Sequence, residues 1–203
     1  MKIALLGATG RAGSRLLAEL LRRGHAVAGI ARHPEGLAAA PGLTPARGDA
    51  ADEAGLAALL AGHDAVINAL PFAGTDPHRL IRAVKGAGMP RYLVVGGAGS
   101  LEVAPGQLLI DAPGFPAEYR PEASAGRAFL DILRGEQALD WTFLSPAAIF
   151  EPGERTGCFR LGADQLLTDT EGNSRISMED YAIALVDELE RPAHSRRRFT
   201  VAN

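Results

Sequence analysis

A glycine-rich turn between an apolar strand and an amphipathic helix constrains this chain most strongly. The apolar run 2–6 leads directly into Gly7-Ala8-Thr9-Gly10-Arg11-Ala12-Gly13, which has the spacing G-x-x-G-x-x-G. Leucines then recur at helical spacing as far as Gly24, which predicts a helix over 11–23. In this strand–turn–helix context the glycines are typical of dinucleotide binding. The alternative is a tight turn with a purely structural role.

Each glycine has a separate expected task. Gly7 allows a sharp turn off the strand, Gly10 lets the backbone approach a pyrophosphate, and Gly13 lets the helix pack closely on the strand. The free N–H groups and the positive end of the helix dipole favour a phosphate here. The contacts that the turn predicts are Gly7, Thr9, Gly10, Arg11, Ala12 and Gly13.

Strand and helix signals alternate along the chain. Parallel strands joined by crossover helices predict an α/β fold, a Rossmann-like doubly wound parallel sheet, with residues 1–203 as a single domain. Strands are expected at 2–6, 26–31, 44–47, 65–68, 91–95, 141–144 and 198–202. Helices are expected at 11–23, 52–61, 76–86 and 118–135, with a last helix that Ser177 caps.

Two regions depart from this alternation. Residues 98–117 contain prolines and glycines, so we expect an irregular loop that acts as a lid or pocket wall. Residues 146–203 are too short for an independent domain and are expected to include a small cap on the substrate side, over the C-terminal edge of the sheet. The basic run 196–198 is interpreted as a solvated cluster rather than a phosphate-binding patch.

Composition excludes several function classes. The 203 residues carry a net charge of −3, which gives no general attraction to nucleic acid or to an anionic membrane. The single cysteine, Cys158, and scattered histidines predict no metal site. No apolar stretch reaches the roughly 20 residues of a membrane span, and the chain begins at once with a strand. We expect a cytoplasmic monomer or homodimer that acts on a small molecule.

The end of the second strand predicts which dinucleotide binds. NAD sites place an acidic residue about 20 residues beyond the glycines, where it binds the ribose 2′-OH. Here Arg32 and His33 follow the strand, and the first acid is Glu35. Since a guanidinium suits a 2′-phosphate, we predict NADP (NADPH) rather than NAD, with Arg32 and His33 at this position. The alternative is a solvated arginine at a strand end.

Further cofactor contacts are expected at the ends of later strands. Asp49 is predicted near the adenine, although a turn role with Asp52 is equally compatible with the sequence. Asn68, Ala69 and Leu70 follow the fourth strand and would lie beside the ribose and pyrophosphate. For Asn68, satisfying the strand end is an equal alternative.

The usual catalytic pair of short-chain dehydrogenases is missing. That pair is a tyrosine with a lysine four residues later, whereas Gly96, Ala123 and Leu185 follow the three tyrosines at this distance. No G-x-S-x-G nucleophile motif occurs. The remaining catalytic candidates are Ser100, which otherwise caps a loop, and Tyr119, which otherwise is a structural tyrosine.

Several motifs together carry a family resemblance. They are the opening turn, Arg32, Val94-Val95-Gly96-Gly97-Ala98-Gly99-Ser100, Leu144-Ser145-Pro146-Ala147 and Arg175-Ile176-Ser177-Met178-Glu179-Asp180-Tyr181. The chain resembles atypical short-chain dehydrogenases/reductases of the NmrA-like and NADH–flavin reductase group, and more distantly biliverdin reductase B. The resemblance implies a Rossmann fold and a nicotinamide cofactor, with the Gly7–Gly13 turn on the pyrophosphate, Arg32 at the 2′-phosphate and Pro146-Ala147 beside the nicotinamide. Gly96 and Gly97 are further expected cofactor contacts.

The resemblance and the missing pair imply a hydride transfer without a protein acid. Hydride can pass directly from nicotinamide to a stacked flavin, so FMN, FAD or a quinone is the expected acceptor. The apolar residues around Leu108, Leu109, Ile110 and Phe115 are expected to form a flat slot for it. The alternatives are a non-catalytic NADP(H)-sensing regulator and an epimerase- or reductase-like enzyme that acts on a small metabolite.

Overall fold

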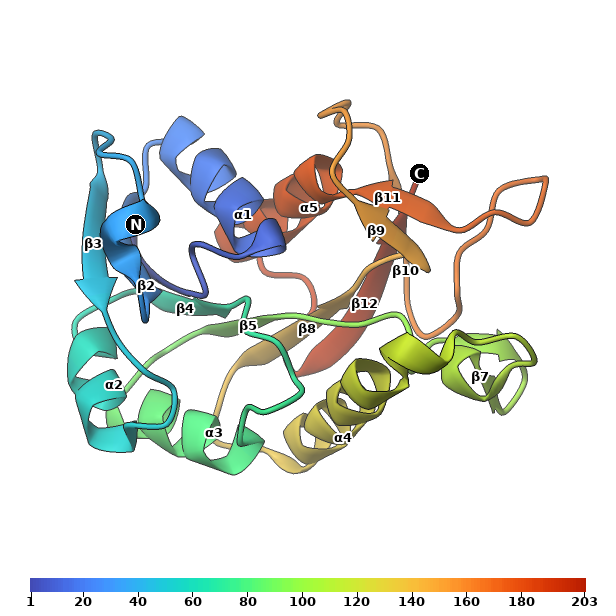
Figure 1. Ribbon diagram of the computed structural model, residues 1–203, viewed down its shortest axis with the longest axis horizontal. Helices are drawn as coiled ribbons and strands as arrows, with labels where there is room; N and C mark the ends of the chain where they lie inside the picture. Colours follow the sequence, from blue (N-terminus) through green and yellow to red (C-terminus); the bar gives the residue numbers. More distant parts are fainter.

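The computed structural model describes residues 1–203 and contains one eight-stranded sheet with helices on both faces (Figure 1). Neighbouring strands are parallel, except that β10 is antiparallel to β12. This confirms the predicted Rossmann-like doubly wound sheet. The strand order is β10 (Arg160–Gly162), β12 (Arg197–Ala202), β8 (Trp141–Ser145), β5 (Tyr92–Val95), β4 (Ala65–Asn68), β1 (Lys2–Leu6), β2 (Ala26–Ala31), β3 (Leu43–Arg47).

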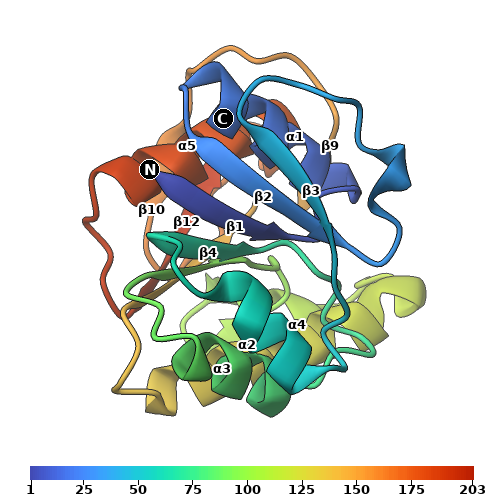
Figure 2. The same ribbon diagram turned by 90° about the vertical axis from the view of Figure 1, so that its left-hand side faces the viewer.

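The helices form two layers, which Figure 2 shows above and below the sheet. Helices α1 (Arg11–Arg22) and α5 (Met178–Glu190) pack together on one face. Helices α2 (Glu53–Leu60), α3 (Pro77–Gly86) and α4 (Arg120–Gly135) cover the other. Each layer encloses its own apolar cluster against the sheet, because buried side chains alternate between the two faces of each strand. None of the helices combines the length and apolar character needed to cross a bilayer.

The strand order reverses beside β1, and this reversal positions the site. Strand β1 pairs in parallel with β2 on one side and with β4 on the other. The chain runs from β1 to β2 and β3 on one side and then crosses to β4 on the other, so the loops after β1 and β4 diverge at the carboxyl ends of these strands. Ligands of open α/β sheets bind at such a point.

The expectation of an irregular loop over 98–117 is wrong. The segment contains a hairpin of β6 (Glu102–Ala104) and β7 (Gln107–Leu108), followed by the 3-10 helices η2 (Leu109–Asp111) and η3 (Ala117–Tyr119). Backbone hydrogen bonds tie Leu109 to Leu101 and Ile110 to Gly99. In the hairpin the backbone N–H and C=O groups find hydrogen-bond partners, which the residue pattern of this segment does not indicate.

The region after residue 145, which was expected to include a small cap, contributes to both the main sheet and a small separate one. Most of it completes the main fold, because β12 and β10 extend the sheet and α5 packs on α1. Only the parallel pair β9 (Ile149–Glu151) and β11 (Arg175–Ser177) forms a separate small sheet, shortly after β8 ends. The predicted cap of α5 is present, since the Ser177 hydroxyl accepts a hydrogen bond from the Asp180 N–H.

The basic run 196–198 is only partly solvated. Arg196 and Arg197 are exposed, but the Arg198 side chain is 3% exposed. Its guanidinium donates hydrogen bonds to the Asp164 carboxylate and to the Ser100 carbonyl oxygen. Burial lowers the pKa of Arg198, although Asp164 opposes this shift. Arg198 is buried because β12 pairs with β8 inside the sheet, where Arg198 lies opposite Phe143.

An extended segment over residues 152–159, here called the strap, crosses α1 and α5. Arg155 donates two hydrogen bonds to Glu19 on α1, and the N–H groups of Thr156 and Gly157 donate to Asp180 on α5. Burial alone would raise the pKa of Glu19, but hydrogen bonds from Arg22, Arg155 and Arg23 hold it well below its usual range.

Candidate cofactor-binding site

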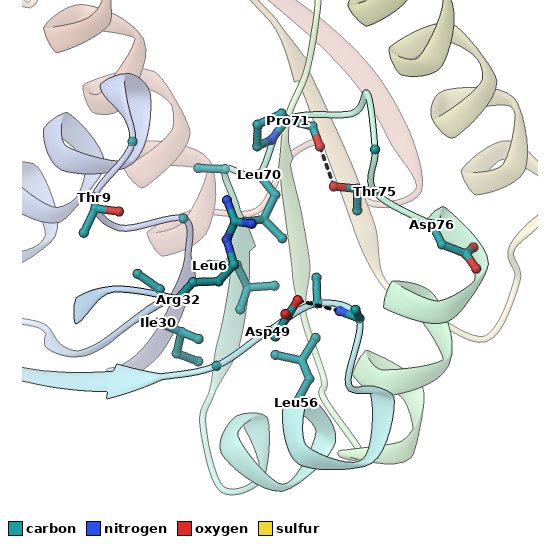
Figure 3. A pocket seen from close by; sticks show the side chains of 18 of the residues that line it. Leu6, Thr9, Ile30, Arg32, Asp49, Leu56, Leu70, Pro71, Thr75 and Asp76 are labelled. Carbon is teal, nitrogen blue, oxygen red and sulfur yellow. Dashed lines mark hydrogen bonds between the residues drawn. The ribbon is translucent and has the colours of Figure 1, made fainter.

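A cavity of about 540 Å³ lies at the carboxyl ends of β1, β2, β3 and β4 (Figure 3). Its 20 lining residues come from the last residues of β1 and β2, from the loops after all four strands, from Leu56 of α2 and from the start of α3. The predicted residues that line it are Gly7, Thr9, Gly10, Arg32, Asp49, Ala69 and Leu70. Residues from four separate loops therefore meet at the point where the strand order reverses.

The glycine-rich turn has the geometry that its sequence requires. Gly7 has a φ of +77°, which a side chain would strain, and its N–H donates to the Ile30 carbonyl at 3.0 Å. A Cβ on Gly13 would lie 2.0 Å from the Gly7 carbonyl oxygen, so only glycine permits this approach of α1 to the turn. A Cβ on Gly10 would lie 3.1 Å from the same oxygen.

The start of α1 is open toward a ligand. No side chain caps the helix, and the N–H groups of Arg11, Ala12 and Gly13 have no acceptor within the protein. Such N–H groups, together with the helix dipole, favour a phosphate. The Arg11 side chain is exposed and makes no ion pair, and neither it nor Ala12 lines the cavity.

Arg32 is a free cation at the edge of the cavity. It is exposed and makes no hydrogen bond or ion pair with the protein, and Figure 3 shows it projecting from the end of β2 into the cavity. The nearest acid in the sequence, Glu35, pairs with Arg47 of β3 instead. His33 is exposed and does not line the cavity. The end of β2 thus offers an unpaired guanidinium, whereas its acid is already engaged.

Asp49 takes the turn role and also lines the cavity, while its place near the adenine stays a prediction. It lines the cavity, and its Oδ1 accepts a hydrogen bond from the Ala51 N–H at 2.9 Å, which forms the turn before α2. Asp52 caps α2 by accepting from Gly55. The Oδ2 of Asp49 has no donor within the protein, so one carboxylate oxygen stays available to a ligand.

Asn68 takes the structural role that was its alternative. The side chain is 1% exposed, donates to the Tyr92 hydroxyl at 3.2 Å and accepts from the Leu70 N–H at 3.0 Å. Asn68 itself does not line the cavity, in contrast to the prediction of a direct contact. Its hydrogen bond to Leu70 shapes the start of the loop after β4. Burial raises the pKa of Tyr92, which stays protonated.

Several cavity residues were missed by sequence reasoning. The loop from Pro71 to Asp76 and the side chain of Arg79 form one side of the cavity. Arg79 donates to the Ala51 carbonyl at 2.9 Å and thereby bridges the loop after β3 and helix α3. The predicted helix start at residue 76 was the available signal, because a helix that follows a strand of this sheet begins near the ligand edge.

The other predicted cofactor contacts, Gly96, Gly97 and Pro146, directly follow β5 and β8 and lie outside this cavity. A Cβ on Gly96 would lie 2.3 Å from the Phe143 ring, so Gly96 has a packing role. A Cβ on Gly97 would meet nothing within 4 Å, so its backbone faces open space. Pro146 is buried directly after β8. Their cofactor contacts stay predictions.

The two catalytic candidates do not line the cavity. Ser100 is buried and its hydroxyl lies 3.4 Å from the Arg198 guanidinium, whereas Tyr119 is 62% exposed. Their catalytic roles stay predictions. Among the residues of the expected apolar slot, Ile110 is buried in the fold and Phe115 contacts Arg120, whose guanidinium lies 5.5 Å from the ring centre.

The fold and the glycine-rich turn define a Rossmann-type nucleotide-binding protein. The chain belongs to the NAD(P)H-binding family, whose model matches residues 7–192. It is 42% identical to YwnB of Bacillus subtilis (strain 168), an uncharacterized protein, over 217 residues that cover 100% of this chain and 99% of YwnB.

Two solved structures are similar over nearly the whole chain. A provisionally named epimerase from Bacteroides thetaiotaomicron is 43% identical, with a TM-score of 0.95 and coverage of 99% of this chain and 96% of that one. A provisionally named NADH–flavin reductase from Streptococcus pneumoniae TIGR4 is 36% identical, with a TM-score of 0.81 and coverage of 100% and 99%. The family and these neighbours support an NAD(P)H-dependent oxidoreductase with a nicotinamide cofactor.

Proposed function

We propose that this protein is an NADPH-dependent reductase that transfers hydride to a flat acceptor such as a free flavin or a quinone. The observation that carries the choice of cofactor is the unpaired Arg32 beside the cavity. A lone guanidinium is complementary to a 2′-phosphate, and because Glu35 is engaged by Arg47, no free acid follows β2 at the position where NAD sites bind the ribose diol.

The residues present fit such a cofactor. The uncapped start of α1 would hold the pyrophosphate. Because Gly10 has no Cβ in the crowded turn, the backbone there can come close to the pyrophosphate. Arg32 would hold the 2′-phosphate, and Asp49 Oδ2 is free to accept from the adenine amino group. The bound cofactor supplies the hydride. The chain's own contribution is to bind and orient it.

The choice of acceptor follows from the available side chains. Tyr181 donates to the Leu144 carbonyl at 2.7 Å and is fully buried, and Tyr92 is bound to Asn68. Neither of these tyrosines is free to protonate a carbonyl. A stacked flavin or quinone needs alignment more than a protein acid at the hydride-transfer step. The name of the Streptococcus pneumoniae relative agrees with a flavin acceptor.

A second candidate function is a non-catalytic NADP(H)-sensing regulator. The observation in its favour is that no lysine follows any of the three tyrosines at the four-residue spacing of the usual catalytic pair. The epimerase name of the Bacteroides thetaiotaomicron relative points to a third activity, the use of a bound nicotinamide on a small metabolite.

Steady-state oxidation of NADPH with FMN, FAD and menadione separates the first two functions. The reductase predicts turnover above background with at least one acceptor and a preference for NADPH over NADH. Tight NADPH binding without oxidation by any acceptor would favour the sensor. Absence of NADPH binding would overturn both.

A further inference from the structure

The loop after β4 forms a complete side of the cavity, and few contacts from its own strand hold it there. Its residues from Ala69 to Asp76, except Phe72, all line the cavity. Ala69 donates to the Leu6 carbonyl at 3.0 Å, and Thr75 bonds back to Pro71 within the loop. Between these points the backbone has no partner on β1 or α3. The shape of this side of the cavity therefore depends on an element other than the strands whose ends form the cavity.

That element is the first turn of α4, through Glu122. One carboxylate oxygen accepts from the Phe72 N–H at 2.7 Å, and the other accepts from the Ala73 N–H at 2.8 Å. Two charge-assisted hydrogen bonds from consecutive amides fix both the position and the direction of the loop. A glutamate in the first turn of a helix also interacts favourably with the helix dipole. Here, however, its oxygens are used by another segment, 49 and 50 residues away.

Packing of Phe72 against α4 and β8 also holds the loop in place. Phe72 is buried, and its ring lies 5.3 Å from the Phe129 ring and 5.9 Å from the Phe143 ring. A Cβ on Gly126 would lie 2.9 Å from the Phe72 ring, so glycine makes room for it one turn after Glu122. Phe72 therefore points away from the cavity into the core, while its neighbours on both sides face the cavity.

We propose that Glu122 is a positioning residue for the adenosine half of the cofactor, because it holds the loop 69–76 in the form that lines the cavity. This inference rests on the proposed function, since it takes the ligand to be an adenosine 2′,5′-bisphosphate group attached to a nicotinamide nucleotide. Glu122 touches no reacting atom in this role. It acts through the two amides that it binds.

The test uses the isosteric variant Glu122→Gln, which keeps the volume of the side chain but turns a donating NH₂ toward one of the two amides. Affinities for NADPH and for adenosine 2′,5′-bisphosphate are measured by fluorescence or calorimetric titration. We expect both dissociation constants to rise about tenfold, in line with the loss of a hydrogen bond to a charged group. Hydrogen exchange of the peptide that covers Phe72 and Ala73 should become faster.

Two control variants distinguish positioning from general loss of stability. Glu118→Gln removes the same charge from an exposed side chain that makes no hydrogen bond, and it should change neither readout. Leu133→Ala removes a buried side chain of α4 far from the loop and should lower the melting temperature. It should leave the affinity for adenosine 2′,5′-bisphosphate and the exchange of the loop unchanged.

The outcomes separate this inference from the proposed function. If the parent protein binds NADPH and Glu122→Gln binds it equally well, the positioning role is overturned and the proposed function stands. If Leu133→Ala weakens adenosine 2′,5′-bisphosphate as much as Glu122→Gln does, stability alone explains the effect and the role is also overturned. If the parent binds neither NADPH nor adenosine 2′,5′-bisphosphate, both proposals fail.

Discussion

Removing the Arg32 side chain should change cofactor preference without changing stability. Arg32 is exposed and makes no hydrogen bond or ion pair with the protein, so Arg32→Ala leaves no protein group without a partner. The free energy of unfolding should therefore stay within about 0.5 kcal/mol of the parent value. Any larger effect must come from binding.

The magnitude follows from the interaction that is lost. A hydrogen bond between a guanidinium and a phosphate contributes about 1.5–3 kcal/mol, which corresponds to roughly a 10- to 150-fold change in the dissociation constant. Since Arg32 is exposed, the lower part of this range is expected. NADH lacks the 2′-phosphate, so its affinity should change less than about twofold. Arg32→Asp adds repulsion and should reverse the preference.

Calorimetric titration of NADPH and NADH at two salt concentrations checks this prediction. Arg82→Ala is the matched control, because Arg82 is also exposed but pairs with Glu53 and does not line the cavity. Added salt should weaken NADPH binding more in the parent than in Arg32→Ala, because screening acts on exposed charges. Equal losses for NADPH and NADH in Arg32→Ala would refute the reasoning.

Three further substitutions test packing and electrostatics elsewhere. Gly13→Ala places a Cβ 2.0 Å from the Gly7 carbonyl oxygen, so the backbone must move apart. Urea unfolding should show a loss of about 1–3 kcal/mol in the free energy of unfolding. Gly135→Ala, whose Cβ meets nothing within 4 Å, should show no loss. The lowered pKa of Glu19 means that its contribution to stability is present above its unfolded pKa of about 4.3 and is lost as pH falls toward the folded value. The melting temperatures of the parent and Glu19→Gln should accordingly differ most near neutral pH and begin to converge as pH falls below about 4, and a constant difference would contradict the network. Arg198→Met should cost about 2 kcal/mol in urea unfolding because the Ser100 carbonyl loses its buried donor, while the exposed Arg197→Met should be nearly neutral.

Local features of this fold could be predicted from the sequence because neighbours along the chain decide them. Gly7 needs a positive φ and Gly13 needs space for a carbonyl oxygen, and both requirements arise within one turn. Ser177 caps α5 through an N–H three residues away. The segment 98–117 was predicted wrongly because the hairpin of β6 and β7 has few residues and little periodicity, so its prolines and glycines dominated the pattern.

Features that join distant residues could not be predicted in this way. Arg79 lines the cavity because α3 follows β4, and its guanidinium meets the Ala51 carbonyl only in the folded chain. Glu122 has the sequence context of an ordinary first-turn glutamate, and nothing near it indicates that it binds Phe72 and Ala73.

The sequence alone determined that a parallel sheet opens with a turn suited to a dinucleotide, because strand periodicity and glycine spacing are local properties. It also placed a guanidinium at the end of the second strand. Only the tertiary structure decided that Glu35 pairs with Arg47 and leaves Arg32 free, and that Asn68 is engaged by Tyr92. The physical reason is that a charged or polar side chain takes the partner that lies nearest in space, and the sheet register determines that neighbour.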